Sequence, residues 1–205
     1  MTKTIKQILA IILTFIMIVS TMPMAFATDV PVANGTAGES VTWVLTDDGV
    51  LTISGTGAMN TDWYSPPWKE YNESITEVVV EEGITKISDS AFCYAKNLVT
   101  VSIPATVTYV AGYTFDGCKM LEEINVAEEN TAYKSIDGIL FTEDEKTLVM
   151  YPANKNCDKY TIPSSVTTIG EMAFESNQGI NTVIIPDTVT VMEFSAFTDS
   201  AISTI

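Results

Sequence analysis

The chain has 205 residues, and its 26 acidic residues against 10 lysines, with no arginine and no histidine, give a formal net charge of −16 at pH 7. A phosphate backbone requires a cationic partner surface, so nucleic acids and anionic membrane surfaces are excluded as partners. Without histidine, neither a Ser-His-Asp or Cys-His catalytic arrangement nor a His-containing zinc site can be built. Acid–base chemistry by paired carboxylates is the catalytic option that composition leaves open.

The N-terminal segment has the organisation of a secretory signal peptide. Lys3 and Lys6 precede an apolar run over residues 8–19, and Ala25-Phe26-Ala27 fits a small-x-small cleavage site. We therefore predict a signal peptide over residues 1–27 and a secreted or cell-surface protein whose mature chain does not span a membrane. Its net charge would be 8 − 26 = −18. The alternative is an uncleaved anchor, but the run is short for a span of about 20 residues.

Residues 28–74 are predicted to form a leader and an N-terminal cap. Residues 28–40 are expected to be an exposed leader. The alternating segments 41–45 and 50–54 flank Asp48-Gly49, a combination typical of a β-hairpin, here over residues 41–56. The following segment, 58–74, is aromatic: it is interpreted as a cap over the first repeat, with a platform for stacking on sugars as the alternative. Its aromatic and proline residues are Trp63, Tyr64, Pro66, Pro67, Trp68 and Tyr71.

A 23-residue repeat occupies residues 75–205. Each unit opens with an apolar residue followed by two more at the third and fifth positions after it, and a fixed period of this length is typical of a solenoid. The opening residues are Ile75, Leu98, Leu121, Cys157, Ile180 and Ile202. The predicted units are 75–97, 98–120, 121–156, 157–179, 180–201 and a truncated 202–205, the last favouring a fragment of a longer protein.

Within a unit, the order of signals predicts a strand, a stop and a second apolar pair. Prolines 104, 163 and 186 follow the opening strand and end it, because proline has no backbone donor. Phenylalanine then recurs near the end of four units and predicts an internal aromatic stack. Those residues are Phe92, Phe115, Phe174 and Phe197.

The third unit and the cysteines depart from the pattern. The third unit has 36 residues, lacks this phenylalanine and carries two strand-like runs around residues 143–146, which predicts a β-hairpin insertion. Cys118 and Cys157 occupy apolar positions of the repeat and are interpreted as small buried hydrophobes. A disulfide between Cys93 and Cys118 is the less favoured alternative.

The repeat resembles that of BspA-like bacterial leucine-rich repeat proteins. The similarity lies in residues 107–121, 162–174 and 185–189, in the entry segment 42–59 with Pro67-Trp68, and in the insertion from Asn130 to Pro152. The resemblance implies a leucine-rich-repeat solenoid, rich in parallel β-strands with short helical or irregular turns and preceded by a β-hairpin cap. It also implies a secreted or cell-surface protein that mediates binding or adhesion, and it supplies no catalytic residues and no cofactor.

The opening strands are expected to present their intervening side chains outward in parallel rows about 4.8 Å apart. We predict that these rows bind a protein, such as a host matrix or cell-surface protein, or a glycan; a solvated sheet face is the alternative. Acidic pairs such as Glu122-Glu123 are interpreted as solvated surface rather than a metal or glycosidase site, so no enzyme is predicted. Two further possibilities stay open, a glycan-targeting accessory module and a structural spacer of a longer surface protein. The candidate residues are Glu77, Val79, Thr100, Ser102, Glu123, Asn125, Lys159, Thr161, Thr182 and Ile184.

Overall fold

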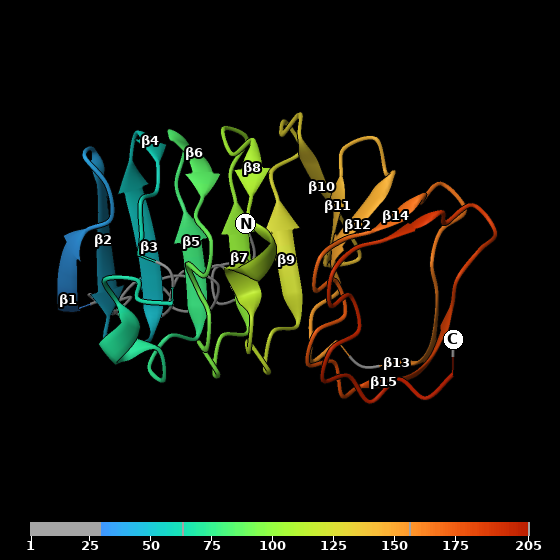
Figure 1. Ribbon diagram of the computed structural model, residues 1–205. Helices are drawn as coiled ribbons and strands as arrows, with labels where there is room; N and C mark the ends of the chain where they lie inside the picture. The colour runs from blue at the N-terminus through green and yellow to red at the C-terminus, as the bar shows by residue number, and fades with distance from the viewer. Residues whose placement is uncertain (1–29, 63, 156, 205) are drawn as a thin grey trace, which may run out of the picture.

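The computed structural model describes residues 30–62, 64–155 and 157–204. It is a β-solenoid of about six turns with little helix, in which the coils stack one on the next and the last coils turn away from the first ones (Figure 1). The predicted signal peptide, Trp63 of the aromatic segment and the terminal Ile205 lie outside the described residues. Within them, no helix is long and apolar enough to cross a membrane.

The opening strands of the first units form one continuous sheet. Strands β5 (Glu77–Val80), β7 (Thr100–Ile103) and β9 (Glu123–Val126) pair in parallel, in the order that the 23-residue period predicts. Val78, Val101 and Ile124 point inward and are fully buried. The period-two alternation therefore places one row of side chains in the core and the neighbouring rows on the outer face.

The predicted hairpin extends this sheet on its N-terminal side. Strands β2 (Val41–Thr46) and β3 (Val50–Gly55) pair antiparallel, and β3 pairs in parallel with β5. Strand β1 (Pro31–Thr36) adds to β2, so the segment expected to be an exposed leader contains an ordered edge strand. Its alternate residues stay exposed, including Val30 just before it and Val32 within it. The sheet order is β1-β2-β3-β5-β7-β9.

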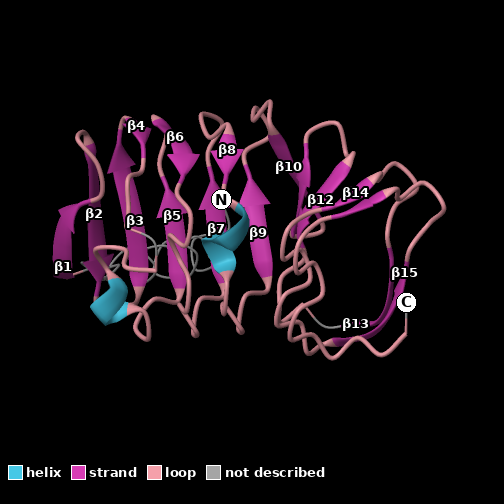
Figure 2. Cartoon of the chain, in the orientation of Figure 1, coloured by secondary structure: helices cyan, strands magenta, loops and turns pink. Residues whose placement is uncertain are grey.

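A second row of short strands closes the opposite side of the coil. It contains β4 (Gly57–Ala58), β6 (Ile84–Ile87) and β8 (Tyr109–Val110), paired in parallel. Two 3-10 helices, Lys69–Tyr71 and Gly112–Phe115, form part of the connections. Figure 2 shows that strands and loops make up nearly all of this arrangement.

The long third unit contains a three-stranded meander. Strands β11 (Ile139–Thr142) and β12 (Thr147–Met150) form the predicted hairpin, and β10 (Tyr133–Ile136) pairs antiparallel with β11 as an additional strand. Strand β12 then pairs in parallel with β14 (Thr168–Ile169), which pairs with β16 (Val191–Met192). Strand β12 of the insertion is therefore the first strand of a new parallel row that continues through β14 and β16 of the last coils.

The opening strands of the last coils form a separate sheet. Strands β13 (Cys157–Thr161) and β15 (Ile180–Ile184) pair in parallel with each other, whereas β9 ends the larger sheet. In Figure 1 the coil that carries β13 and β15 is turned away from the row that ends at β9. The solenoid thus consists of an N-terminal block, with β1 to β9, and a C-terminal block, with β10 to β16.

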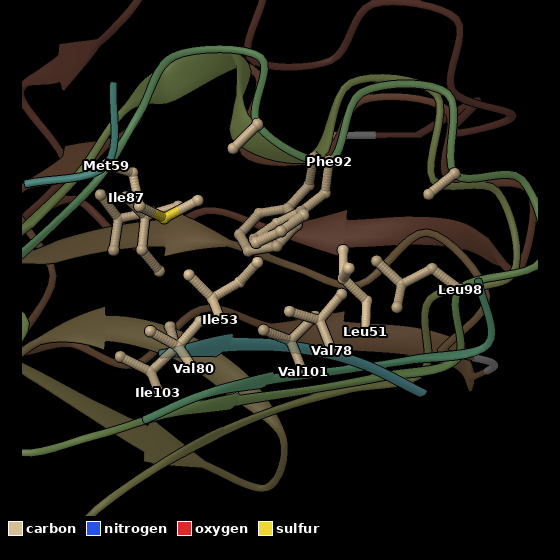
Figure 3. Packing of buried hydrophobic residues seen from close by; sticks show 14 of the residues in the cluster. Leu51, Ile53, Met59, Val78, Val80, Ile87, Phe92, Leu98, Val101 and Ile103 are labelled. Carbon is tan, nitrogen blue, oxygen red and sulfur yellow. The ribbon is translucent and has the colours of Figure 1, made fainter. Parts of the chain in front are cut away.

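Two hydrophobic clusters fill the solenoid, each with an aromatic stack: the first extends from the N-terminal block into the insertion through Tyr133, Leu140 and Met150, and the second lies in the C-terminal block. In the N-terminal block Trp68, Phe92 and Phe115 stack with ring centroids 6.0 Å apart at each step. Phe92 lies over Leu51, Val78 and Val101 (Figure 3). In the C-terminal block the rings of Tyr151, Phe174 and Phe197 stack at 5.2 and 4.9 Å. The predicted phenylalanine stack is confirmed, except that Phe197 in the last coil is only partly buried.

The three cysteines are free thiols. Cys93 and Cys118 are both buried, and because both are free thiols, the disulfide alternative is not formed. Cys157 is only half-buried, which corrects its interpretation as a buried hydrophobe. Cys157 is the first residue of β13, which pairs with β15 on one edge only. The other edge of β13 has no strand partner within the described residues, so Cys157 is less covered there.

Candidate functional site

Six of the ten predicted site residues lie together on the outer face of β5, β7 and β9. Strand register places Glu77 beside Thr100 and Thr100 beside Glu123. A second row lies two residues further along each strand, where the register pairs Val79 with Ser102 and Ser102 with Asn125. We call these six residues the outer sheet face.

The other four predicted residues form a separate patch. Lys159 pairs with Thr182, and Thr161 pairs with Ile184, on β13 and β15. The expectation of rows continuing across all five strands is wrong, because the insertion separates β9 from β13 and no pairing joins them. A ligand on the outer sheet face therefore meets three strands of repeats rather than five.

A shallow apolar hollow adjoins the outer sheet face at the carboxyl ends of its strands. Its volume is about 330 Å³, at the lower end of the roughly 300–1,000 Å³ typical of ligand pockets. Ser102 and Asn125 of the outer sheet face contribute polar groups to it. Its complete lining is Val80, Ser102, Ile103, Pro104, Asn125, Val126 and Ala127. An apolar hollow beside polar rows is a surface on which an apolar side chain of another protein can be covered.

The acidic border of this face lies toward the insertion. Glu122 and Glu123 line a second hollow of about 290 Å³ together with Asn154 and Lys155. The Asn154 Nδ2 atom donates a hydrogen bond of 2.9 Å to Glu122 Oε1. Within the described ranges, no group of three or more Cys, Asp or Glu side chains is placed to hold a metal ion. Glu122 and Glu123 thus place negative charge at this border of the outer sheet face.

The aromatic segment before the repeats is divided between core and surface. Trp68 is fully buried, and its Nε1–H donates a 2.8 Å hydrogen bond to the Ala91 carbonyl. Tyr71 packs against Trp43, with ring centroids 6.2 Å apart. Tyr64 instead lies beside Tyr94 of the first repeat, at 6.0 Å. Sequence reasoning missed Tyr94, because the turn that carries it has no apolar periodicity.

The buried thiols are chemically inert in this environment. Burial, with a smaller contribution from the Asp116 charge, raises the pKa of Cys93 to about 11, and burial also raises the pKa of Cys118. Because the thiolate is the nucleophilic form, neither residue is activated for attack at neutral pH.

The chain belongs to the BspA type leucine rich repeat family, whose repeat matches residues 70–148 and 150–205 in six copies. Its recurring unit is the 23-residue coil described above. A search of curated proteins finds no match.

Solved structures with TM-scores just above 0.5 share the fold at low sequence identity. The pneumococcal vaccine antigen PcpA is 15% identical with a TM-score of 0.52, covering 86% of this chain and 70% of that one. A leucine rich cell surface protein from Faecalibacterium prausnitzii is 17% identical with a TM-score of 0.51, covering 87% and 77%. A leucine-rich repeat protein from Eubacterium ventriosum is 24% identical with a TM-score of 0.46, and this chain covers 63% of its length.

Proposed function

We propose that this protein is a secreted, non-enzymatic scaffold at the cell surface that binds a protein partner through the outer sheet face. The observation that carries the proposal is the register of β5, β7 and β9, which places two rows of outward side chains beside an apolar hollow. Family membership supports a repeat scaffold. A fold neighbour described as a cell surface protein supports the location by analogy.

The chemistry of this face favours a basic protein partner. Glu77 and Glu123 supply negative charge on its rows, and Glu122 adds to it at the border. The face has no tryptophan, tyrosine or arginine of the kind that dominates high-affinity hot spots. We therefore expect a partner that combines surface lysines or arginines with an apolar side chain for the hollow, bound with moderate affinity.

A binding screen tests this proposal. Fluorescently labelled purified protein is applied to host cells and to immobilised host matrix proteins, with an unrelated protein of similar acidity as the control for charge alone. The proposal predicts saturable binding to at least one cell type or matrix protein. Binding to none of them, or binding no greater than that of the control, would contradict an adhesive role.

A further inference from the structure

A hollow lies at the N-terminal end of the solenoid, away from the outer sheet face. Its volume is about 320 Å³, and it is bordered by residues of the segment before the repeats and of the first repeat turn. The rings of Tyr64 and Tyr94 meet there at 32°. We call this feature the tyrosine hollow.

The backbone at both tyrosines is unusual and defines their position. Tyr64 has φ +53° and Tyr94 has φ +59°, in the left-handed region that large side chains rarely adopt. The turn position of Tyr94 is occupied one coil later by Gly117, which suits this conformation better. A Cβ on Gly117 would lie 2.6 Å from the Tyr94 ring, so the ring rests directly on this glycine. The same turn position also has positive φ in later coils, at Ser176 and Asp199, so this conformation belongs to the repeat turn and sets the direction of the Tyr94 side chain.

The two rings are held by a shared acceptor. The Tyr64 hydroxyl donates to Asp116 Oδ2 at 3.1 Å, and the Asp116 charge and its hydrogen bond with Tyr94 raise the pKa of Tyr94. Tyr94 nevertheless keeps 49% of its surface exposed. The hollow therefore presents a positioned aromatic surface with apolar ring faces and polar edges.

The border of the hollow offers both donors and acceptors, and its charges nearly cancel. Lys69 and Lys96 oppose Glu70 and Glu73, and the Lys96 Nζ atom lies 3.7 Å from Glu73 Oε1. An anionic ligand would also meet Asp116 and the net charge of −16, and a cationic ligand would lie beside Lys69 and Lys96 although the overall charge attracts it. A neutral ligand rich in hydroxyl groups can use both kinds of partner.

One wall residue has an unused acceptor. Asn72 Nδ2 donates 2.8 Å to the Cys93 carbonyl, which fixes the orientation of the amide. Its Oδ1 atom is buried and has no hydrogen-bond partner among the described residues. A ligand hydroxyl group that reached this atom would supply the missing donor.

We propose that the tyrosine hollow binds a neutral saccharide, whose ring lies against Tyr94 and whose hydroxyl groups meet the mixed charged border. This site is independent of the protein-binding role assigned to the outer sheet face. Of the described aromatic residues in the segment before the repeats, Tyr64 lines this hollow, whereas Trp68 is part of the core.

Saturation-transfer NMR with defined probes tests the proposal. The neutral probes are cellobiose, lactose, mannobiose and diacetylchitobiose, and the charged probes are glucuronate, inorganic phosphate and choline. We expect at least one neutral probe to bind at millimolar concentration. Binding of charged probes alone, or of none, overturns the proposal.

Two further measurements locate the binding. Tyr94→Ala should weaken the binding of the neutral probe by roughly tenfold or more. Tyr109→Ala should leave this binding unchanged, because Tyr109 is similarly exposed, at 51%, but lies on β8 outside the tyrosine hollow. Equal effects of the two variants overturn the site assignment. If Tyr94→Ala does not fold, amide shifts of the wild-type protein decide: the probe should shift residues 69–73 and 93–96, and shifts confined to other regions contradict the site.

Discussion

At the scale of single residues, one position of the coil determines where the interior lies. Phe92 and Phe115 are 23 residues apart, as are Phe174 and Phe197, and this spacing predicted their stacking. Trp68 stacks on Phe92 from the segment before the repeats. Tyr151 lies 23 residues before Phe174 and fills the same position in the third unit. Neither residue was assigned to the stack from sequence: Trp68 was interpreted as part of a cap, and Tyr151 lies in the unit that lacks the recurring phenylalanine.

Removing one ring from this stack should be costly. Phe115 is only 3% exposed, and Phe115→Ala leaves a cavity that lowers the free energy of unfolding by about 3–5 kcal/mol. Urea denaturation measures this loss. Phe194→Ala is the matched control, because Phe194 is 69% exposed and should change stability little. Equal stability of the Phe115→Ala and wild-type proteins would refute the placement of the ring.

A second residue-scale feature is the buried carboxyl group of Glu175, which is 6% exposed. Its Oε2 atom accepts a 3.2 Å hydrogen bond from Gly117 N–H of the N-terminal block, and the Ser176 hydroxyl donates to Oε1. Burial raises the pKa of Glu175, the two hydrogen bonds oppose that rise, and the charges of Asp116 and Asp199 add to it. The ionised form of Glu175 is therefore less favoured in the folded protein than in the unfolded chain.

The sign of the resulting pH dependence follows from this direction. A pKa above that of the unfolded chain stabilises the fold at pH below about 4.3, and this contribution is lost as pH rises through the raised value. Glu175→Gln stays neutral, so its stability relative to wild type should increase between about pH 4 and about pH 7. Urea denaturation at several pH values measures the difference. A difference independent of pH would show that the carboxyl group does not titrate abnormally.

At the scale of elements, the insertion in the third unit was predicted in part: its hairpin was recognised from the sequence, and its first strand was not. The charged turn 143–146 predicted the β11–β12 hairpin, which is confirmed. Strand β10 was missed because its residues, from Tyr133 to Ile136, lack clear alternation. A usable signal was present: Asp137-Gly138 connects β10 to β11, and both residues have positive φ, 53° and 74°.

The insertion also completes the second strand row through a side chain. Tyr133 at the start of β10 is 9% exposed, and its hydroxyl oxygen accepts a 3.0 Å hydrogen bond from Val110 N–H on β8. Nearby, buried Asn130 donates to the Pro104 and Val107 carbonyls and accepts from the Ala132 and Tyr133 amides. Sequence periodicity gives no information on such contacts, because they depend on which coil lies next to the insertion.

Loss of the Tyr133 hydroxyl should destabilise the junction. Tyr133→Phe leaves the buried Val110 N–H without its acceptor, at a cost of about 1–3 kcal/mol in the free energy of unfolding. The exposed Tyr109 on the same strand as Val110 provides the control, Tyr109→Phe, which should be neutral. Thermal and urea denaturation of both variants distinguish them, and equal stabilities would mean that water satisfies the Val110 amide.

At the scale of the whole molecule, the solenoid and its core were predictable, whereas the turn between its two blocks was not. The period places Val78, Val101 and Ile124 in one buried row. It cannot show that β9 and β13 fail to pair, since this depends on the packing of the insertion. As a result, the six residues of the outer sheet face lie on one sheet, as expected, whereas the four candidate residues on β13 and β15 lie on a separate sheet.

The net charge of −16 makes partner binding sensitive to salt. We expect the affinity for a basic partner to fall as salt rises from about 0.1 M to about 1 M, because the screening length shortens from about 10 Å to about 3 Å. The decrease should lie mainly in the association rate. Surface plasmon resonance measures it, and an affinity that does not change with salt would contradict recognition through the acidic border.

The central claim is that the outer sheet face binds the protein partner. The most direct test measures the affinity of two charge-matched variants for that partner. Thr100→Arg places a bulky cation in the middle of the outer sheet face. Thr85→Arg places the same group at an exposed position of β6, on the opposite side of the coil. The account predicts about a tenfold or greater loss of affinity for Thr100→Arg by surface plasmon resonance and wild-type affinity for Thr85→Arg. Equal affinities of the two variants would contradict it.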